Sequence, residues 1–322
     1  MKKIGVFTSG GDSPGMNACV RAVVRTAVHN GLQVFGIRRG YQGMIEGDIT
    51  ELSAPSVANI LQYGGTLLKT ARSADFLTPE GRKIAADQLH RHGIEGLVCI
   101  GGNGTYTGAM VFEKEYGIPG IGCPGTIDND LYGTDYTIGF DTAINTAMEA
   151  IDKIRDTADS HNRVFFVEVM GRHAGHIALL SGIAGGAEGI FVPERQNEFE
   201  AVIHTYSQKS RNKEFSIFIV CEGDEEGHAY EVARRFQEVY PDTDCRITVL
   251  GHVQRGGSPT AMDRILASRL GAHAVKGLLE GRKNCAVGVV SNDIVFTPFS
   301  EAIYKKKDIP ENLWSLNAMI SR

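Results

Sequence analysis

Short apolar runs, many of them β-branched, recur along the chain and alternate with longer segments whose apolar residues have helical spacing. Near-continuous apolarity is typical of strands in a parallel sheet that is covered on both faces. The predicted strands lie at residues 3–8, 33–38, 96–100, 164–169, 215–221, 246–251 and 285–290. The clearest predicted helices lie at residues 16–30, 139–157, 229–239 and 259–279. This alternation predicts an α/β fold with parallel sheet.

Composition narrows the class of protein. The chain has 322 residues, which is enough for about two ordinary domains, and 42% of them are hydrophobic. A net charge of -5 argues against a general binder of nucleic acid or membrane surfaces. The six cysteines are scattered without a CxxC pair, which favours buried, reduced thiols. With no apolar stretch of about 20 residues and no signal-like start, the sequence predicts a cytoplasmic protein.

Two predicted strands run into similar glycine-rich turns, "SGGDSPGMN" at 9–17 and "IGGNGTYTG" at 100–108. Glycines let a phosphate approach main-chain N–H groups, and the following helix N-terminus adds positive potential. Neither turn is a G-x-G-x-x-G or a Walker A motif, and a plain strand-to-helix turn is the alternative. Two such turns in one chain favour a nucleotide site.

The segment "CPGTIDNDLYGTDYTIGFDTA" (123–143) contains the strongest candidate for catalysis. Thr126, Asp128 and Asp130 alternate, so they point to one side if the stretch is extended. One carboxylate of such a pair can accept a proton from a substrate hydroxyl while the other supports geometry and charge. The alternative is an Asx-rich turn that caps the helix predicted near 139. The neighbouring glycine turns favour catalysis.

Cationic side chains cluster at the ends of later strands and suggest an anionic substrate. Arg172 follows the strand in "VEVMGRHAG", and Arg246, His252 and Arg255 surround another in "RITVLGHVQRGGSP". For each of these residues taken alone, the alternative is an ordinary surface position. His173 and His176 are spaced like metal ligands, but no third ligand is near in the sequence, so a surface or capping role is favoured.

Together these segments closely resemble the bacterial-type ATP-dependent 6-phosphofructokinases, in colinear order over essentially the whole chain. The motifs "SGGDSPGMN", "PGTIDND", "SHNR", "MGR" and "GHVQRGGSP" carry the resemblance. It implies transfer of the γ-phosphoryl group of ATP, with Mg²⁺, to the 1-hydroxyl of fructose 6-phosphate, a glycolytic step. It also implies a homotetramer with active sites shared between subunits.

The resemblance further implies two Rossmann-like, three-layer α/β/α domains with mostly parallel sheets. Residues 1–138 and 251–303 would bind ATP, and residues 139–250 and 304–322 would bind fructose 6-phosphate. The implied nucleotide site comprises Gly11, Tyr41, Arg72, Ser73, Gly102, Asn103, Gly104, Thr105 and Gly108.

Asp128 matches the family's acceptor of the sugar hydroxyl proton, and further residues match groups near the transferred phosphoryl: Thr126, Asp130, Arg172 and Gly11. The implied fructose 6-phosphate site comprises Thr126, Ile127, Asp128, Met170, Gly171, Arg172, Glu222, His252 and Arg255. Arg163 and Arg246 match arginines that reach this site from a neighbouring subunit.

A second site is implied for an effector, ADP or phosphoenolpyruvate, at a subunit interface. The matching positions are Arg21, Arg25, Arg155, Glu188, Arg211 and Lys213. Ala54 stands where well-known relatives have arginine, so we expect a weakened or altered effector response. The alternative is that these cations only form interface ion pairs.

The residues at positions 103, 104 and 125 bear on the phosphoryl donor and its metal ion. Pyrophosphate-dependent relatives have aspartate at the position of Gly104 and lysine at that of Gly125, so the glycines favour ATP. Asn103 replaces the aspartate that helps hold Mg²⁺ in the family. It could leave a binding or regulatory protein, a slower kinase whose Mg²⁺ is held by ATP and water, or a site that regains aspartate by deamidation. We expect reduced but detectable activity.

Overall fold

The computed structural model describes residues 1–159, 163–195, 198–207, 215–223 and 227–321. The chain forms two compact units, each described by itself below. The first comprises residues 1–127, 131–142 and 255–307, and the second comprises 128–130, 143–254 and 308–322. The predicted domain boundaries lie after residues 138, 250 and 303, whereas the boundaries of the compact units lie after residues 127, 130, 142, 254 and 307.

The first unit contains a seven-stranded sheet with the order β11-β10-β5-β4-β1-β2-β3. Its strands are β1 (Lys3–Thr8), β2 (Gln33–Ile37), β3 (Ile49–Leu52), β4 (Gly96–Gly101), β5 (Gly120–Pro124), β10 (Cys285–Val290) and β11 (Asp293–Pro298). The five inner strands are parallel, and the edge strands β3 and β11 are antiparallel to their neighbours. The prediction of mostly parallel sheet is confirmed.

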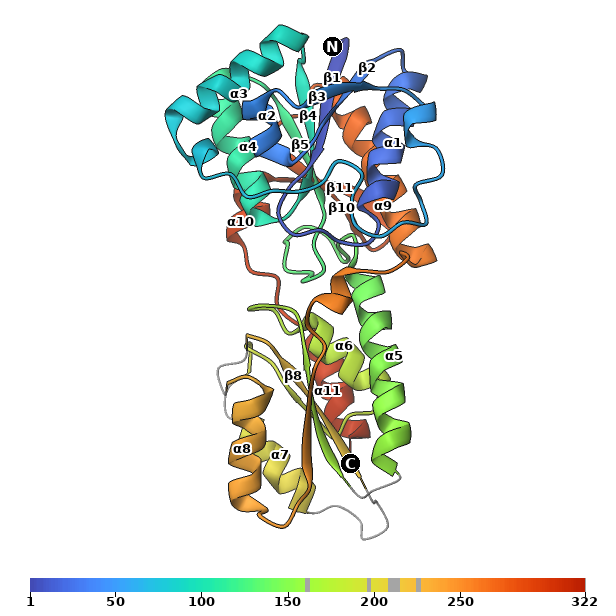
Figure 1. The fold of residues 1–322 in the computed structure, drawn as a ribbon, viewed down its shortest axis with the longest axis vertical. Coiled ribbons are helices and arrows are strands. Elements are labelled where there is room, and N and C mark those ends of the chain that lie inside the picture. Colours follow the sequence, from blue (N-terminus) through green and yellow to red (C-terminus); the bar gives the residue numbers. More distant parts are fainter. Residues whose placement is uncertain (160–162, 196–197, 208–214, 224–226, 322) are drawn as a thin grey trace. The chain divides into compact units, whose positions relative to one another are not determined.

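Helices cover both faces of this sheet (Figure 1). Helices α1 (Met16–His29) and α9 (Ala261–Leu279) pack together on one face. The other face carries α2 (Gly40–Glu46), α3 (Pro79–His92), α4 (Asn103–Tyr116) and α10 (Phe299–Tyr304). Each face has its own apolar cluster, so the inner strands are buried on both sides, as their continuous apolarity predicts.

The described residues of the second unit form a parallel sheet with the order β7-β8-β6-β9. Its strands are β6 (Val164–Val169), β7 (Gly189–Phe191), β8 (Ser216–Cys221) and β9 (Cys245–Val249). Its helices are α6 (His176–Ala184), α7 (Glu198–Ser207), α8 (Ala229–Val239) and α11 (Glu311–Ile320), with most of α5 (Phe140–Asp159). Phe166 packs against Phe218 and Phe236 between the sheet and α8, with ring centroids 5.1 and 5.4 Å away.

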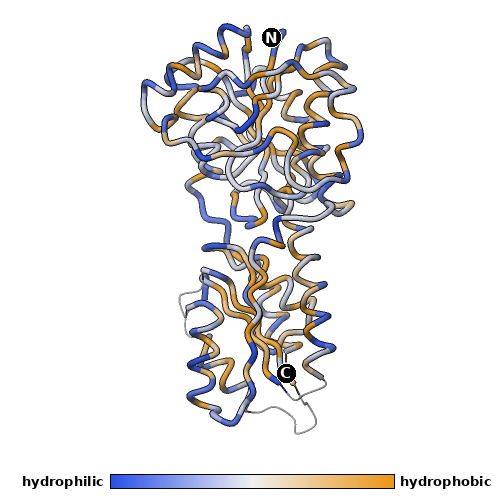
Figure 2. The backbone as a smooth tube through the Cα atoms, in the orientation of Figure 1, coloured by the Kyte–Doolittle hydropathy of each residue, from blue (hydrophilic) through white to orange (hydrophobic). Residues whose placement is uncertain are grey.

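The hydropathy of the chain follows these layers. Figure 2 shows the central strands largely in hydrophobic colours and many outer loops in hydrophilic ones. All seven predicted strands and all four predicted helices are present, with small shifts at their ends. Among the described residues, no helix is both long enough and apolar enough to cross a membrane.

Candidate active site

Three turns follow three adjacent parallel strands of the first unit. Strand β4 lies between β1 and β5, so their carboxyl ends meet at one edge of the sheet. The turns are tied by backbone hydrogen bonds: Ser9 N donates to Ile100 O (3.0 Å), and Gly125 N donates to Gly101 O (3.1 Å). From β1 the chain proceeds to β2 on one side and later to β4 on the other, and ligands of α/β proteins bind at such a reversal.

The turn after β1 brings Gly11 close to Arg255. Gly10 has a φ of 86°, which favours glycine because a side chain is strained there. A Cβ on Gly11 would lie 2.4 Å from Nη1 of Arg255, and this nitrogen donates to Asp12 O at 3.3 Å. The structure therefore places two predicted site residues that are 244 positions apart along the chain against each other.

The turn after β4 leads directly into helix α4. Asn103 is the first residue of this helix, and Gly102 precedes it in an extended conformation. Asn103 is half-buried, Gly104 is exposed, and an added Cβ on Gly104 would have no atom within 4 Å. The first N–H groups of a helix lack intrahelical partners, so this end of α4 is suited to bind an anion.

Tyr41 supports the start of α4 from the side. Its hydroxyl donates to Thr105 O at 2.5 Å, and a Cβ on Gly108 would lie 2.8 Å from its ring. The ring stacks on Phe76 with centroids 3.9 Å apart, and burial raises the Tyr41 pKa well above its ordinary value. Glycine at position 108 is thus required by the close approach of a packed aromatic ring.

The two remaining residues of the predicted nucleotide site, Arg72 and Ser73, lie in the loop before α3. Ser73 donates through Oγ to Oε1 of Gln42 at 2.8 Å and accepts from Phe76 N at 3.2 Å. Arg72, next to it, is exposed. The loop is therefore attached to α2 beside Tyr41, while the guanidinium of Arg72 is accessible to solvent.

The segment after β5 is not an extended stretch, which was the condition for one-sided Thr126, Asp128 and Asp130. The chain bends at Ile127 and Asp128, and Asn129 adopts a left-handed conformation with a φ of 55°. Thr126, Asp128 and Asp130 would point to one side only in regular β geometry, and that condition is not met. Ile127 and Asp128 are buried, whereas Thr126 and Asp130 are half-buried.

The strand ends of the second unit bring together another group of predicted residues. Strands β6 and β8 are adjacent, and Glu222 after β8 accepts through Oε1 from Arg172 N (3.0 Å) and Gly171 N (3.4 Å) after β6. Arg172 is left-handed, with a φ of 53°. A Cβ on Gly223 would lie 1.5 Å from Arg172 O, so only glycine fits there. Met170, before this turn, is buried.

His252, His173 and His176 do not belong to a metal-binding cluster among the described residues. His252 is exposed in the 3₁₀ turn Gly251–Arg255 that follows β9. His176 is buried as the first residue of α6, and His173 is exposed. Within the described ranges, no group of three or more His, Cys, Asp or Glu side chains could hold a metal ion.

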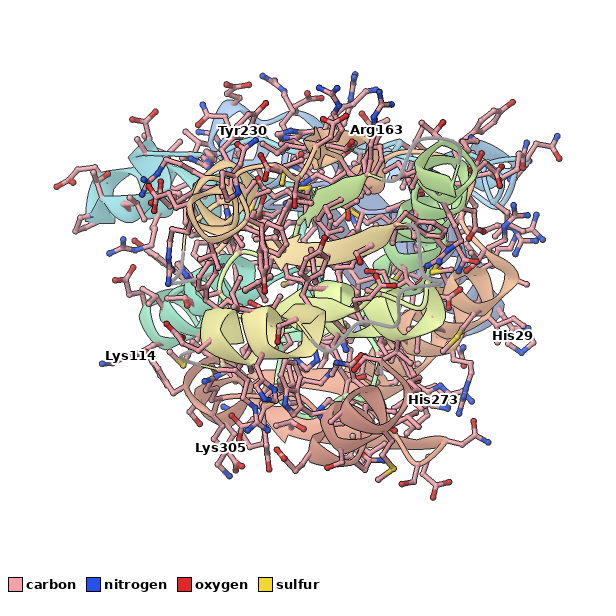
Figure 3. All side chains as sticks on the ribbon, turned by 90° about the horizontal axis from the view of Figure 1, so that it is seen from below. His29, Lys114, Arg163, Tyr230, His273 and Lys305 are labelled. Carbon is pink, nitrogen blue, oxygen red and sulfur yellow. The ribbon has the colours of Figure 1, made fainter. Side chains whose placement is uncertain are left out.

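Arg163 and Arg246 lie at the opposite end of the second sheet from Arg172. Arg163, labelled in Figure 3, precedes β6, and Arg246 is the second residue of β9. Both bind Oδ2 of Asp244, at 2.8 and 3.1 Å, and Arg163 is the main cause of a lowered Asp244 pKa. Within one chain the two arginines are not brought to the Arg172 turn.

The predicted effector residues are distributed over several elements. Arg21 and Arg25 lie on α1 of the first unit. In the second unit, Arg155 of α5 donates to Gly185 O and Gly186 O, and Glu188 accepts from Ile217 N at 2.6 Å. Arg211 and Lys213 lie outside the described residues.

One buried carboxylate in the first unit, Asp263 of α9, was not predicted from the sequence. It is 1% exposed and accepts hydrogen bonds from Gly139 N and Thr142 N (both 2.8 Å) and from Thr142 Oγ1 (2.5 Å). Asp263 thereby caps the N-terminus of α5. The available signal was the pattern Thr260-x-x-Asp263, which is typical of a helix start.

Asp263 makes stability depend on pH in an unusual direction. Burial is the main reason that its pKa rises from 3.8 to about 6. The folded chain therefore retains a proton that the unfolded chain has lost, and the free energy of unfolding falls as pH rises from about 4 to about 6. We expect this contribution to total about 3 kcal/mol and to be absent from Asp263→Asn. Denaturant unfolding of both proteins at pH 4.5 and 7 measures about two thirds of it; an equal pH dependence in the two would contradict it.

Two α/β units with glycine turns and helix N-termini at strand ends are typical of proteins that bind phosphorylated ligands. Comparison with known proteins narrows this class. A family model described as Phosphofructokinase matches residues 3–278. The protein called ATP-dependent 6-phosphofructokinase 1 in Thermus thermophilus is 57% identical over 322 residues, 100% of both chains. A Cytophaga hutchinsonii protein called ATP-dependent 6-phosphofructokinase is 57% identical over 317 residues, 98% of this chain and 97% of its own. The chain belongs to the phosphofructokinase family.

Solved structures agree with this assignment. The phosphofructokinase of Saccharomyces cerevisiae superposes with a TM-score of 0.89 at 38% identity over 99% of this chain. This chain spans 47% of the yeast chain. A pyrophosphate-dependent phosphofructokinase from Marinobacter aquaeolei, at 24% identity and a TM-score of 0.84 over 97% of this chain and 86% of its own, shows that the fold is shared.

Proposed function

We propose that the chain transfers the γ-phosphoryl group of ATP to the 1-hydroxyl of fructose 6-phosphate and so forms fructose 1,6-bisphosphate. The supporting observation is the set of three joined turns after β1, β4 and β5, of which the third leads to Asp128. It is supported further by full-length relatives that are called ATP-dependent 6-phosphofructokinases. The test is formation of fructose 1,6-bisphosphate from ATP and fructose 6-phosphate with the purified chain.

In this proposal the first unit binds Mg–ATP. The backbone at Gly11 and at Gly102 to Thr105 faces the phosphates, because glycine at these turns allows close approach and α4 begins there. Arg72 and Tyr41 complete the nucleotide site. Mg²⁺ belongs to the substrate complex and needs only one or two protein ligands besides ATP oxygens and water. Asn103 provides a neutral amide oxygen, so the residues present fit a metal ion that ATP brings with it.

The second unit binds the sugar phosphate. The backbone turn at Gly171 and Arg172 is fixed by Glu222, which leaves the guanidinium of Arg172 to neutralise phosphoryl charge. Met170 and His252 contribute further contacts in this unit, and Arg255 is the remaining residue that the family resemblance assigns to the sugar phosphate. Arg163 and Arg246 lie at the other end of the second sheet, and we propose that they serve a neighbouring copy in a homotetramer. Light scattering of the purified chain tests the tetramer.

The transfer step needs few groups. The carboxylate of Asp128 accepts the proton of the 1-hydroxyl as its oxygen bonds to the γ-phosphorus. The bond from the γ-phosphorus to the β–γ bridging oxygen breaks, and ADP leaves with that electron pair. Thr126, Asp130 and Arg172 fix geometry and charge around the moving group, and Mg²⁺ neutralises phosphate charge.

The choice of ATP over pyrophosphate is expected to depend on position 104. Gly104→Asp places a carboxylate in the open space beside the proposed nucleotide site, and we expect the KM for ATP to rise about tenfold through repulsion. Thermal unfolding should be unaffected, since an added Cβ meets nothing and an acidic residue suits the first turn of α4.

The neutral variant Gly104→Asn is the matched control, with nearly the same shape and no charge. Steady-state kinetics with varied ATP should give Gly104→Asn a KM close to that of the parent. Equal KM values for the two variants would refute charge repulsion as the cause. Gly125→Lys is a less informative probe, because a Cβ there would lie 2.9 Å from Met16 Cε and 3.3 Å from Gly101 N.

A binding or regulatory protein of the same fold is the second candidate, and Asn103 is the observation that favours it. We also propose an effector site formed by Arg21, Arg25, Arg155, Glu188, Arg211 and Lys213, altered by Ala54. Titration with ADP and with phosphoenolpyruvate, read as changes in the KM for fructose 6-phosphate, tests that site. Binding of both substrates with no turnover would favour the second candidate.

A further inference from the structure

We propose that Asp263 is a positioning residue for phosphoryl transfer: it fixes the segment that leads to Asp128 against the glycine turn after β1. This inference rests on the proposed function. Asp263 on α9 and its partners, which lie within residues 124–127 and 131–142, all belong to the first unit, whereas residues 128–130 between them belong to the second.

Asp263 belongs to a closed ring of hydrogen bonds that joins the starts of α5 and α9. Its Oδ2 accepts from Thr142 N and Thr142 Oγ1, and that hydroxyl oxygen accepts from Thr260 N at 3.1 Å. Thr260 Oγ1 in turn accepts from Asp263 N at 3.2 Å and donates to Oδ2 of Asp141 at 2.6 Å. We call Asp263, Thr142 and Thr260 the helix-start ring.

From the helix-start ring, contacts lead step by step toward Thr126. The other oxygen of Asp263 accepts from Gly139 N at 2.8 Å. Two residues earlier, Thr137 Oγ1 donates to Thr126 O at 2.6 Å, and Ile138 N donates to Pro124 O at 2.8 Å. Residues 124–139 therefore form a loop whose two ends are joined, and Asp263 holds the end that leads into α5.

Asp263 and the neighbouring residues Ile138 and Gly139 pack against the turn after β1. Gly15 has a φ of 101°, and a Cβ there would lie 3.5 Å from Asp263 Cβ and 2.9 Å from Ile138 Cγ2. Gly139 also has a φ of 101°, and its Cβ would lie 2.6 Å from Ser13 Cβ. A shift at Asp263 is thus transmitted both to the 124–139 loop and to the turn that contains Gly11.

A buried carboxylate is needed at this position because it accepts from three donors through two oxygens. Asparagine has one acceptor oxygen, and its NH₂ group would face an N–H donor, so Asp263→Asn leaves buried donors unpaired. The shape of the side chain is otherwise preserved. The loop is then free to shift, and small displacements of reacting groups lower the rate strongly.

The test compares Asp263→Asn with Asp141→Asn, a matched carboxylate on α5 that is bonded to the same Thr260. We expect Asp263→Asn to lower kcat about tenfold at temperatures where it remains folded, with a KM for ATP within about twofold of the parent. Asp141→Asn should retain the parental kcat. Thr142→Val should behave like Asp263→Asn, and Thr142→Ser, which keeps the hydroxyl, like the parent.

Backbone hydrogen exchange supplies a readout that needs no activity. In Asp263→Asn we expect faster exchange within residues 124–142, relative to Asp141→Asn, and little change at β6 and β8. A parental kcat in folded Asp263→Asn, or unchanged exchange in 124–142, would overturn the proposal. If the parent chain forms no fructose 1,6-bisphosphate, the proposed function fails, while exchange still decides whether Asp263 fixes this loop.

Discussion

Asp128→Asn is expected to lower kcat for fructose 1,6-bisphosphate formation by about a thousandfold, because asparagine cannot accept the hydroxyl proton. The amide has nearly the shape of the carboxylate, and the glycine turns that we propose to face ATP are untouched. Binding of ATP and of fructose 6-phosphate should therefore persist. A coupled assay with single-turnover controls measures the rate, and calorimetry measures the two affinities.

Asp135→Asn is a suitable control, because Asp135 is an exposed carboxylate of the same segment that accepts from Ser291 N at 2.7 Å. It should keep a rate close to that of the parent chain. A rate for Asp128→Asn within about tenfold of the parent would exclude Asp128 as the proton acceptor, since such a base contributes about a hundredfold or more.

Asn103→Asp is expected to raise kcat by about a hundredfold and to lower the Mg²⁺ concentration needed for half-maximal rate. A carboxylate at the start of α4 would add a charged oxygen ligand where asparagine offers only a neutral one. The measurement is a Mg²⁺ titration of the initial rate at saturating ATP and fructose 6-phosphate.

Asn103→Ala tests the proposed role of Asn103 as a metal ligand, because it removes the side-chain oxygen altogether. The expected order of rates is aspartate, then asparagine, then alanine. Equal rates for asparagine and alanine would show that the amide oxygen contributes nothing. An intact-mass measurement on active material decides whether deamidation at Asn103-Gly104 produces the activity; fully intact asparagine would exclude it.

The sheets were predictable because burial on both faces leaves a signature in the sequence. Strands such as β4 and β6 are apolar at nearly every position, and both were predicted. Strands β3 and β11 lie at the sheet edge and are only partly buried, so their sequences lack that signature. Strand β5 was missed because two of its five residues are glycines.

The site was less predictable where the backbone leaves regular geometry. The alternation of Thr126, Asp128 and Asp130 suggests an extended stretch, but the left-handed Asn129 interrupts it. The contact of Gly11 with Arg255 depends on how α9 returns to the first unit, which no local pattern encodes. Asp263 shows a helix-start pattern, yet only the tertiary structure reveals that it caps a different helix.

The turn at Arg172 has a consequence for protein engineering. Gly223 lies so close to Arg172 O that a side chain cannot be added at 223 unless the Arg172 backbone moves, and Glu222 holds that backbone through its N–H. Substitutions at 171, 172, 222 and 223 will therefore have strongly non-additive effects. A library designed to change substrate specificity should vary these four positions together, because single replacements mostly report loss of the turn.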